Sequence, residues 1–329
     1  DVQSSGQPLM TISNRDATKL TVLAMTGVTA LARSTAYTML EKGITYPGEN
    51  VREVLASADI THISNEVAFA GNCPEPQPQR TGMMFCSDPS YIELLEYIGT
   101  DLIELTGDHL ADWGQKAIYL TLDMYAEEGW PVYGGGATLQ EGQQPVIIEH
   151  NGNRLAFLGC NAKGAAFATA TDDAPGAVPC DFALLRGQIE QLVSDGYLPI
   201  VSIQHNEYDL YEAQEIQIRD FRRLAESGAV IVSGSQSHRP QGMEFYENAF
   251  LHYGLGNLFF DQYSVGKPFR QGTIDRHVFY NNRHISTELI PTALIDFAQP
   301  RILSGQERDE LLEILFTASG WEIRSRDQE

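Results

Sequence analysis

Reactive polar residues follow short apolar runs at several places in this chain. The clearest case is Thr106 to His109, where Asp108 and His109 stand side by side directly after the run that begins at Asp101. A carboxylate next to an imidazole can share one metal ion or one proton. Gly107 lets the backbone turn sharply, so that both side chains can face one crevice. We therefore expect Asp108 and His109 to belong to a functional site, with a structural turn as the alternative.

Other candidate site residues also stand where an apolar run ends. Glu66 follows one run, and a buried carboxylate there needs a cation, a hydrogen-bond donor or water. His205 follows a second run and His238 a third. Arg239, next to His238, offers a guanidinium that can hold a carboxylate or phosphate through two hydrogen bonds. For each histidine the alternative is a hydrogen-bonded structural role. The further residues that we expect to contact a ligand are Arg33, Asn65, Gln236, Asn257 and Asp261.

The apolar runs themselves are short and rich in Val, Ile and Leu, which is typical of buried strands. In open α/β sheets, ligands bind beyond the carboxyl ends of the strands. Six polar endings in succession therefore indicate one site that collects loops from across the whole chain. The six runs with their polar endings are 20–27, 59–66, 101–109, 199–207, 229–238 and 250–257.

Helical patterns alternate with these runs, which favours βαβ units and a largely parallel sheet. Residues 1–18 are polar without periodicity and predict a flexible N-terminal segment. Residues 19–329 are then expected to form a single α/β domain ending in a C-terminal helix. A β-hairpin is expected over 274–290, with Asn281 and Asn282 at its turn. The expected helices are 33–42, 47–57, 88–98, 112–129, 181–195, 214–227 and 306–318.

Charge and hydropathy exclude some partners. The chain has 329 residues, with 22 Lys and Arg against 44 Asp and Glu, so its net charge is −22. A field of this sign repels phosphate backbones, so we expect no nucleic-acid partner. No apolar stretch approaches the ~18 residues that a membrane-spanning helix needs. The acidic balance favours cations, cationic polymers or simple solubility.

The four cysteines contain no CxxC pair, which disfavours a zinc ribbon or a redox motif. Three pairings are compatible with the sequence alone. We predict Cys73–Cys86 and Cys160–Cys180, because each bridge closes a loop without secondary-structure signals. Two such bridges indicate an exported or cell-surface protein, and the polar start DVQSSGQP is typical of a processed chain. The alternative is four free thiols in a cytoplasmic protein.

The order of these motifs resembles the CapA (PgsA) family, which is associated with bacterial capsule and poly-γ-glutamate synthesis. The resemblance covers roughly residues 20–300 and is most specific where Tyr253 to Asp261 matches the family's Tyr-Ser-Leu-Gly-Asn-Phe-x-Phe-Asp element. The family's fold is of the calcineurin-like metallophosphoesterase type, so the resemblance implies a four-layer αββα sandwich. The other matching elements are Met25 to Arg33, Asn65 to Glu66, Thr106 to Gly114, Tyr133 to Gly136, Gln204 to Tyr208 and Gly234 to Gln241.

Three positions depart from the family pattern. Val28 stands where the family has its first carboxylate, Ser235 where it has a histidine, and Asp108 where it has an amide. A two-metal site of the calcineurin type needs a bridging carboxylate and several imidazoles, so a complete one is not expected. What remains implies one divalent ion, Mn²⁺ or Zn²⁺, or none. The ligands of that ion would be Glu66, Asp108, His109 and His238.

Three functions are compatible with these observations. The first is an exported surface protein with a degenerate site, which binds an anionic or glycan polymer linked to capsule synthesis. The second is a single-metal hydrolase or transferase on a phosphoester or amide, with an arginine steadying the anion. The third is a structural component of the cell surface. For the second function, the catalytic candidates are Arg33, Asp108, His109, His205 and Arg239, and the substrate-binding candidates are Asn65, Gln236, Asn257 and Asp261.

Overall fold

Two β-sheets packed face to face form the centre of the molecule. The computed structural model describes residues 15–77, 82–164, 166–235 and 237–321. A core of apolar side chains from both sheets fills the space between them, with Leu23 and Ile60 on one side and Phe157 and Ile200 on the other. Alternating strands and helices on this scale bury apolar surface on both faces of each sheet.

The first sheet is mixed. Its strand order is β14-β2-β3-β1-β15-β16-β17, with β4 and then β5 extending from β3. The strands around β3 run parallel, whereas β15, β16 and β17 run antiparallel to their neighbours. The bounds are β1 Leu20–Thr26, β2 Val28–Thr29, β3 Ile60–Asn65, β4 Leu102–Glu104, β5 Val132–Tyr133, β14 Asn257–Phe259, β15 Gln271–Tyr280, β16 His284–Leu294 and β17 Pro300–Ile302.

The second sheet has a parallel centre and antiparallel edges. Its order is β12-β13-β11-β10-β8-β7, and only β12 and β7 pair antiparallel within it. The prediction of a largely parallel sheet therefore fits the centre of the second sheet and the strands around β3 in the first, but not β15 to β17 or the edge strands β7 and β12. The bounds are β7 Val146–His150, β8 Asn153–Asn161, β10 Leu198–Gln204, β11 Ile231–Gly234, β12 Met243–Tyr246 and β13 Ala249–His252, with a small separate pair of β6 Gly135–Gly136 and β9 Gly176–Ala177.

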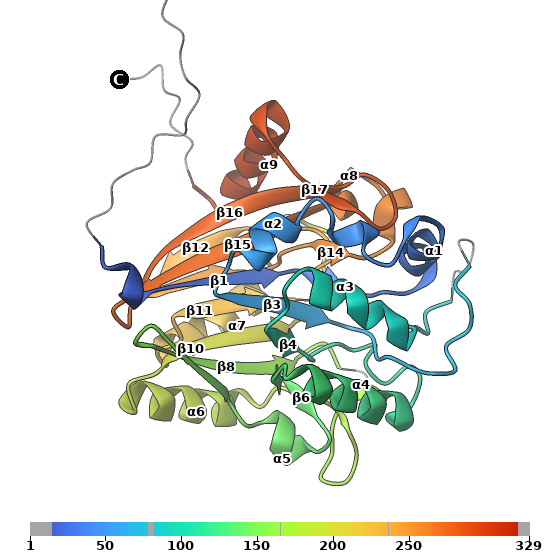
Figure 1. Cartoon of the computed structure of the whole chain (residues 1–329). Helices are drawn as coiled ribbons and strands as arrows, with labels where there is room; N and C mark the ends of the chain where they lie inside the picture. The colour runs from blue at the N-terminus through green and yellow to red at the C-terminus, as the bar shows by residue number, and fades with distance from the viewer. Residues whose placement is uncertain (1–14, 78–81, 165, 236, 322–329) are drawn as a thin grey trace, which may run out of the picture.

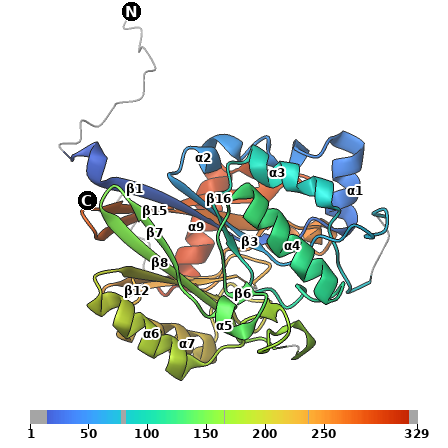
Figure 2. The ribbon, with the colours of Figure 1, turned by 60° about the horizontal axis from the view of Figure 1, so that its bottom comes forward.

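Helices cover the outer faces of both sheets, as Figures 1 and 2 show. Helices α1 to α4 pack on the first sheet, and α6 and α7 pack on the second. The four-layer αββα sandwich expected from the sequence is confirmed. The bounds are α1 Arg33–Lys42, α2 Arg52–Ala56, α3 Ile92–Tyr97, α4 Gln115–Glu128, α5 Leu139–Gly142, α6 Phe182–Ser194, α7 Glu215–Glu226, α8 Lys267–Arg270 and α9 Gly305–Ala318.

Local chemistry explains several of these boundaries. Helix α6 begins where the Asp181 carboxylate accepts hydrogen bonds from two backbone N–H groups of the first turn. Helix α4 ends at Gly129, whose φ of 75° is left-handed and suits a residue without a Cβ. The hairpin between β15 and β16 turns at Asn281 and Asn282, both with positive φ, as predicted from their amide side chains.

Both predicted disulfides are confirmed. Cys73 and Cys86 bridge a loop of the first helical layer, and Cys160 and Cys180 bridge a loop after β8. Most of the N-terminal segment predicted to be flexible lies outside the described residues, and a 3₁₀ turn, Ala17–Lys19, begins inside its last part. Within the described ranges we find no helix that is both long and apolar enough to cross a bilayer.

Candidate functional site

Two carboxylates and one amide form the centre of the candidate site. Glu66 follows β3 and Asp108 follows β4, and their side chains are buried, at 3% and 8% exposure. Gln204, the last residue of β10 on the opposite sheet, donates from Nε2 to Glu66 Oε1 at 3.1 Å and to Asp108 Oδ1 at 2.7 Å. These contacts lie where strand ends of the two sheets meet.

Gly107 keeps the two carboxylates close together. A Cβ built at this position would lie 2.8 Å from the Cα of Glu66 and 2.9 Å from its carbonyl oxygen. Any larger residue would push the loop after β4 away from Glu66, because both atoms belong to backbone. The need for glycine here is thus close packing against Glu66, in addition to the sharp turn that the sequence suggested.

Lys163 places an ammonium group at this pair of carboxylates. Its Nζ lies 2.9 Å from Asp108 Oδ2 and 3.6 Å from Glu207 Oε2. Burial opposes the charge on Lys163, but the negative charge of Asp108 raises the pKa of the ammonium overall. Burial also opposes the charge on Asp108, and Lys163 is the main group that lowers the pKa of that carboxyl. The two groups stabilise each other as an ion pair.

Glu66 is the protonated member of the carboxylate pair. Burial, followed by the negative charge of Asp108, raises the pKa of Glu66 to about 8. Its Oε2 has no hydrogen-bond partner among the described residues. The environments of Glu66 and Asp108 thus push their pKa values in opposite directions.

His109 is held in place by a carboxylate three residues further on. Its Nδ1 lies 2.7 Å from Asp112 Oδ2, and the same oxygen accepts a hydrogen bond from the backbone N–H of Phe85. The imidazole also packs against the Phe85 ring, with 4.4 Å between ring centroids. Burial alone would lower the pKa of His109, but Asp112 and the neighbouring carboxylates raise it. Helix α4 is capped by Gly114, so Asp112 orients His109 and does not cap the helix.

His238 enters the site from the loop after β11. Its Nδ1 lies 2.9 Å from Asn257 Oδ1, and its Nε2 lies 3.8 Å from Glu207 Oε1. The ring stacks on Phe260. Burial lowers the pKa of His238, which favours the neutral imidazole. Asn257, predicted as a substrate-binding residue, therefore positions His238 by accepting from its ring.

Arg33 and Asp261 form a separate ion pair at the start of α1. The guanidinium donates to both carboxylate oxygens of Asp261, at 3.0 and 2.5 Å, and the backbone N–H of Ser34 donates to the same side chain. The guanidinium also lies over the rings of Phe85 and Phe260. Arg33 has a φ of 47°, which is unusual for a residue with a side chain. Asp261 thus both neutralises Arg33 and caps the N-terminus of α1.

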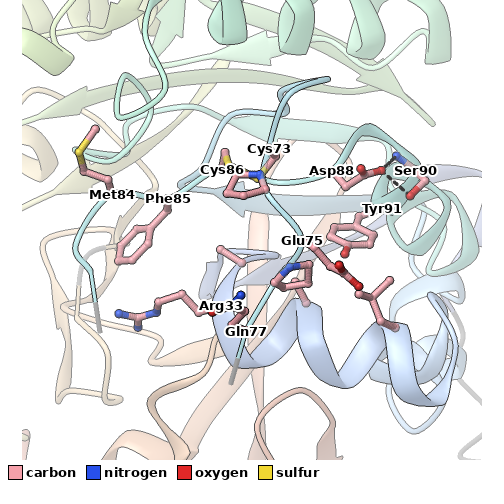
Figure 3. A pocket seen from close by; sticks show the side chains of 15 residues that line it. Arg33, Cys73, Glu75, Gln77, Met84, Phe85, Cys86, Asp88, Ser90 and Tyr91 are labelled. Atoms are coloured by element: carbon pink, nitrogen blue, oxygen red, sulfur yellow. Dashed lines mark hydrogen bonds between the residues drawn. A yellow bond between two sulfur atoms is a disulfide. The ribbon is translucent and has the colours of Figure 1, made fainter. Parts of the chain in front are cut away.

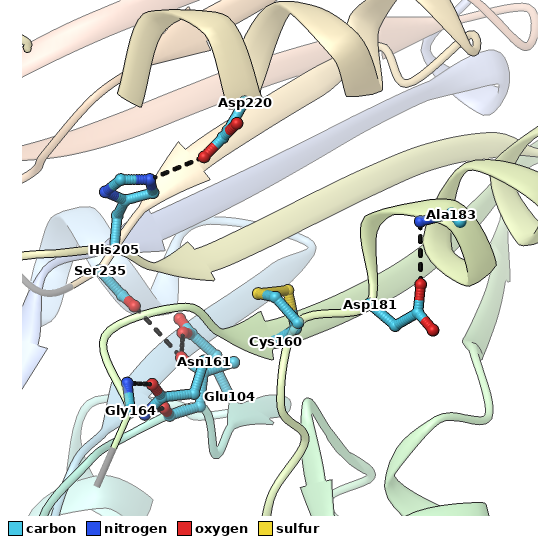
Figure 4. Close-up of a disulfide and its surroundings, with 11 residues drawn as sticks. Glu104, Cys160, Asn161, Gly164, Asp181, Ala183, His205, Asp220 and Ser235 are labelled. Atoms are coloured by element: carbon cyan, nitrogen blue, oxygen red, sulfur yellow. Dashed lines mark hydrogen bonds and ion pairs between the residues drawn. A yellow bond between two sulfur atoms is a disulfide. The ribbon is translucent and has the colours of Figure 1, made fainter. Parts of the chain in front are cut away.

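The structure places three other candidates away from this cluster. Asn65 points toward helix α4, where its amide donates to the Tyr125 hydroxyl at 2.6 Å. The His205 ring faces α7, with Nε2 3.1 Å from Asp220, as Figure 4 shows. Arg239 pairs with Asp209 and covers the ring of Phe269. Adjacent strand residues alternate between the two faces of a sheet, so neighbours in sequence need not share a site. Gln236 lies outside the described residues.

Val28 and Ser235, two of the three departures from the family pattern, lie on the inner face of the fold. Val28 is buried and registers with Ser64 of β3 and Asn257 of β14, so all three side chains share one face of the parallel strands. Ser235 follows β11 and lies 3.2 Å from Thr106 Oγ1. Neither an apolar nor a hydroxyl side chain at these two positions supplies the carboxylate or imidazole that a two-metal site needs.

The donor atoms present do not fit a divalent ion. The Gln204 N–H group points at both Glu66 and Asp108, and the Lys163 ammonium approaches Asp108 from its second oxygen. A metal would need those oxygens as ligands, with hydrogen-bond donors directed elsewhere. Across the ranges that the structure describes, no three or more His, Cys, Asp or Glu side chains are arranged to hold a metal. The predicted ligand set is therefore not assembled as a chelating group.

A pocket of about 360 Å³ opens beside this cluster, between α1 and the loop closed by Cys73–Cys86, as Figure 3 shows. Arg33 and Phe85 line it and also contact the site, so the pocket and the cluster share a wall. Its volume falls in the range of small-ligand pockets. The pocket is also lined by Leu40, Glu75, Asp88 and Tyr91.

Sequence reasoning assigned no role in the site to Lys163 or to Asp112. Lys163 stands alone in a Gly- and Ala-rich loop, and no motif marks it. Its position between Cys160 and Cys180 was the available signal, because the bridge fixes the ends of that loop. Asp112 could have been found from its spacing, since residues three apart in a helical turn lie on one face.

Comparison with known proteins agrees with this fold. The family model "Bacterial capsule synthesis protein PGA_cap" matches residues 22–262. The PGA biosynthesis protein CapA of Bacillus subtilis (strain 168) is 26% identical over 176 residues, which cover 52% of this chain and 45% of that protein. The capsule biosynthesis protein CapA of Bacillus anthracis is 25% identical over 175 residues, covering 52% and 43%. The matches thus span less than half of either relative.

Among solved structures, the NAD nucleotidase NadN of Haemophilus influenzae matches with a TM-score of 0.51 at 11% identity, covering 93% of this chain and 64% of that one. That likeness concerns the fold alone. The molecule is a four-layer α/β protein of the calcineurin-like metallophosphoesterase type. The chain belongs to the bacterial capsule synthesis PGA_cap family, which confirms the resemblance to CapA proteins seen in its motifs.

Proposed function

We propose that this protein is an exported, capsule-associated protein that binds a polymer in its crevice without hydrolysing it. The observation that carries the proposal is the Gln204 amide nitrogen between Glu66 and Asp108. A group that donates to both carboxylates occupies the lone pairs that would otherwise bind a catalytic metal. Family membership supports the link to capsule synthesis, and the two disulfides support export.

The pocket beside Arg33 is the proposed place for one unit of the polymer. It joins the crevice through Phe85 and combines apolar walls with two carboxylates, Glu75 and Asp88. Carboxylates accept hydrogen bonds from hydroxyl groups, and ring faces pack on apolar surface. The Tyr91 hydroxyl remains protonated there, because burial and then Asp88 raise its pKa to about 12.

Charge favours an uncharged glycan over a polyanion. The net charge of −22 repels anionic chains at long range. Two cations at the crevice and pocket already contact carboxylates, since Arg33 pairs with Asp261 and Lys163 with Asp108. An anionic polymer would have to displace one of these partners. The relatives named for PGA or capsule biosynthesis leave the polymer of this chain open.

The test is binding of defined polymers to the purified protein. We expect a neutral capsule-type polysaccharide to bind and polyglutamate to bind more weakly or not at all. Leu40→Trp narrows the mouth of the pocket at a half-exposed position and should weaken binding several-fold. Leu184→Trp, on α6 in the opposite helical layer, has similar exposure and should leave binding unchanged. Failure of every polymer to bind, or equal effects of both variants, would contradict the proposal.

A single-metal hydrolase is the second candidate, and two observations favour it. Asp112 contacts the Nδ1 atom of His109 and Asn257 that of His238, and a hydrogen bond of this kind to one ring nitrogen orients an imidazole whose other nitrogen binds a metal. Glu66 also keeps one oxygen without a partner among the described residues. Hydrolysis of a phosphodiester substrate by the wild type with Mn²⁺, abolished by chelator, would support this candidate over the first.

A further inference from the structure

The acidic crevice carries a cation of its own. We infer that Lys163 takes the place of a divalent metal in this site, so that the carboxylates around it are neutralised by the chain itself. This inference rests on the proposed metal-free function and deepens it, because it names the residue that makes a metal unnecessary. The observations that carry it are the position of the ammonium, the way its loop is fixed, and the side chains at positions 28 and 235.

The ammonium lies where a cation is needed. Lys163 Nζ contacts Asp108 Oδ2 at 2.9 Å and approaches Glu207 Oε2 at 3.6 Å, while Asp108 Oδ1 is held by Gln204. The Lys163 side chain is only 26% exposed and that of Asp108 only 10%. At such burial an unpaired carboxylate would be strongly unfavourable, so this contact differs from an ordinary surface ion pair.

The backbone around Lys163 is tied to the strand ends that carry the site. Ala162 and Lys163 both donate their N–H groups to the carbonyl oxygen of Gln204, at 2.8 and 3.1 Å. Asn161 donates to the Thr106 carbonyl at 2.8 Å and accepts from the Gly164 N–H at 2.8 Å. Thr106 stands shortly before Asp108 in the chain, and Gln204 donates a hydrogen bond to Asp108. The loop of Lys163 is therefore tied to both segments that position Asp108.

A disulfide fixes the same loop from its other side. Cys160 lies at the end of β8, and its bridge to Cys180 stands next to Asn161, as Figure 4 shows. The Cys180 N–H donates to the Asn161 carbonyl. Little backbone freedom is therefore lost when the ammonium contacts Asp108, because the backbone of the loop is positioned in advance.

Lys163 supplies a positive charge where ligands expected from the family pattern are missing. Val28 removes one carboxylate that the resemblance places at this crevice, Ser235 removes an imidazole, and Asp108 adds a carboxylate where the family has an amide. The carboxylates that are present would repel one another without a cation, and the Lys163 ammonium supplies that cation in the absence of metal.

The experiment compares Lys163→Met with Lys163→Arg and with Lys116→Met, a lysine on the exposed side of α4. Each protein is treated with chelator, and its unfolding midpoint is measured with and without Mn²⁺ or Zn²⁺. Calorimetric titration of the metal alone then gives its affinity. We expect the unfolding midpoints of the wild type, Lys163→Arg and Lys116→Met to be the same with and without metal. Lys163→Met should unfold at lower temperature in chelator, recover with metal, and bind the ion at least tenfold more tightly than the wild type.

Lys163→Gln keeps a hydrogen-bond donor for Asp108 but no charge, and it should also gain metal-dependent stability if Lys163→Met does not fold. The inference is overturned if added metal leaves the unfolding midpoints of Lys163→Met and Lys163→Gln unchanged, or if the wild type binds the ion as tightly as these variants do. Polymer binding by the wild type is measured separately. Retained polymer binding with no metal response in the variants would refute the role of Lys163 and leave the proposed function standing.

Discussion

The side-chain nitrogen of Gln204 lies 2.7 Å from Asp108 Oδ1, across the junction of the two sheets. An amide nitrogen can only donate a hydrogen bond, so the Asp108 oxygen that accepts it is not available as a metal ligand. The same nitrogen reaches Glu66 Oε1. One glutamine at the end of β10 therefore donates to one oxygen of each of the two buried acids of the crevice.

Replacing Gln204 with Leu should destabilise the fold. The variant keeps a similar volume but leaves two buried carboxyl groups without their donor, which costs about 1–3 kcal/mol. Urea unfolding of wild type and variant measures the change in the free energy of unfolding. Gln140→Leu, at an exposed position on α5, is the control and should change stability little. Equal stabilities of the Gln204 and Gln140 variants would show that the Gln204 contacts contribute nothing.

Glu66 should make stability fall as the pH rises from about 4.5 to about 8. The folded state raises the pKa of Glu66 from 4.5 to about 8, mainly through burial. Between these values the folded protein keeps a proton that the unfolded chain has lost, so each rise in pH favours unfolding. Glu66→Gln cannot titrate and should show a flatter profile above pH 5, which denaturant unfolding in chelator at several pH values would detect. Parallel profiles for the two proteins would mean that Glu66 is ionised in the folded state.

Asp112 should keep His109 protonated to higher pH. The carboxylate lies 2.7 Å from His109 Nδ1, and it is the largest of the groups that raise the pKa of this imidazole against the effect of burial. In Asp112→Asn, the pKa of His109 should fall by roughly 1–3 pH units, as expected on loss of a neighbouring opposite charge. An NMR titration of the imidazole measures it. Asp123→Asn, on the exposed face of α4, is the control and should leave the pKa of His109 unchanged.

A carboxylate at position 28 should make the protein depend on metal. Val28 shares a sheet face with Asn257, which contacts His238, so Val28→Asp adds a charge beside the crevice. Without a cation that charge lowers stability, and a bound divalent ion would restore it by mass action. The variant should melt below the wild type in chelator and recover with Mn²⁺ or Zn²⁺. A melting temperature that responds to neither would show that position 28 does not face the crevice.

Much of the fold could be predicted from the sequence because local signals and packing agree. The expected helix 33–42 coincides with α1, and 181–195 differs from α6 by one residue at each end. Apolar runs ending in polar clusters marked most strand ends correctly, because parallel strands place these ends at one edge. The run 250–257 is the exception, since β13 ends at His252 and Asn257 begins β14. Antiparallel edges such as β7 were not predicted, since alternation alone does not give strand direction.

The site was harder to predict than the fold, because its partners are far apart in sequence. Glu66, Asp108 and His238 were named from their places after strands, and the structure brings the first two together through Gln204. Asn65 and His205 were placed in the site by proximity in sequence, but their side chains point to Tyr125 and Asp220. Side-chain direction depends on strand phase and on neighbours from other elements, which a motif does not encode.

Lys163 could not be predicted as a site residue from the sequence. Nothing in a Gly- and Ala-rich loop distinguishes a lysine that enters a crevice from one in solvent. Its role follows only from the backbone contacts of its loop with Gln204 and Asn161, which are set by tertiary structure. The role of a charge that completes a buried cluster can be recognised only when the structure shows the other members of that cluster.

Elemental analysis of the wild-type protein tests directly whether the crevice binds a metal ion. The protein is produced in medium supplemented with Mn²⁺ and Zn²⁺, purified without chelator, and its bound metal is counted per chain. The ammonium of Lys163 and the amide of Gln204 already contact both oxygens of Asp108 and one oxygen of Glu66, so we expect far less than one ion per chain. A stoichiometric Mn²⁺ or Zn²⁺ ion that is lost in Glu66→Gln would contradict the account and restore the metal-dependent hydrolase.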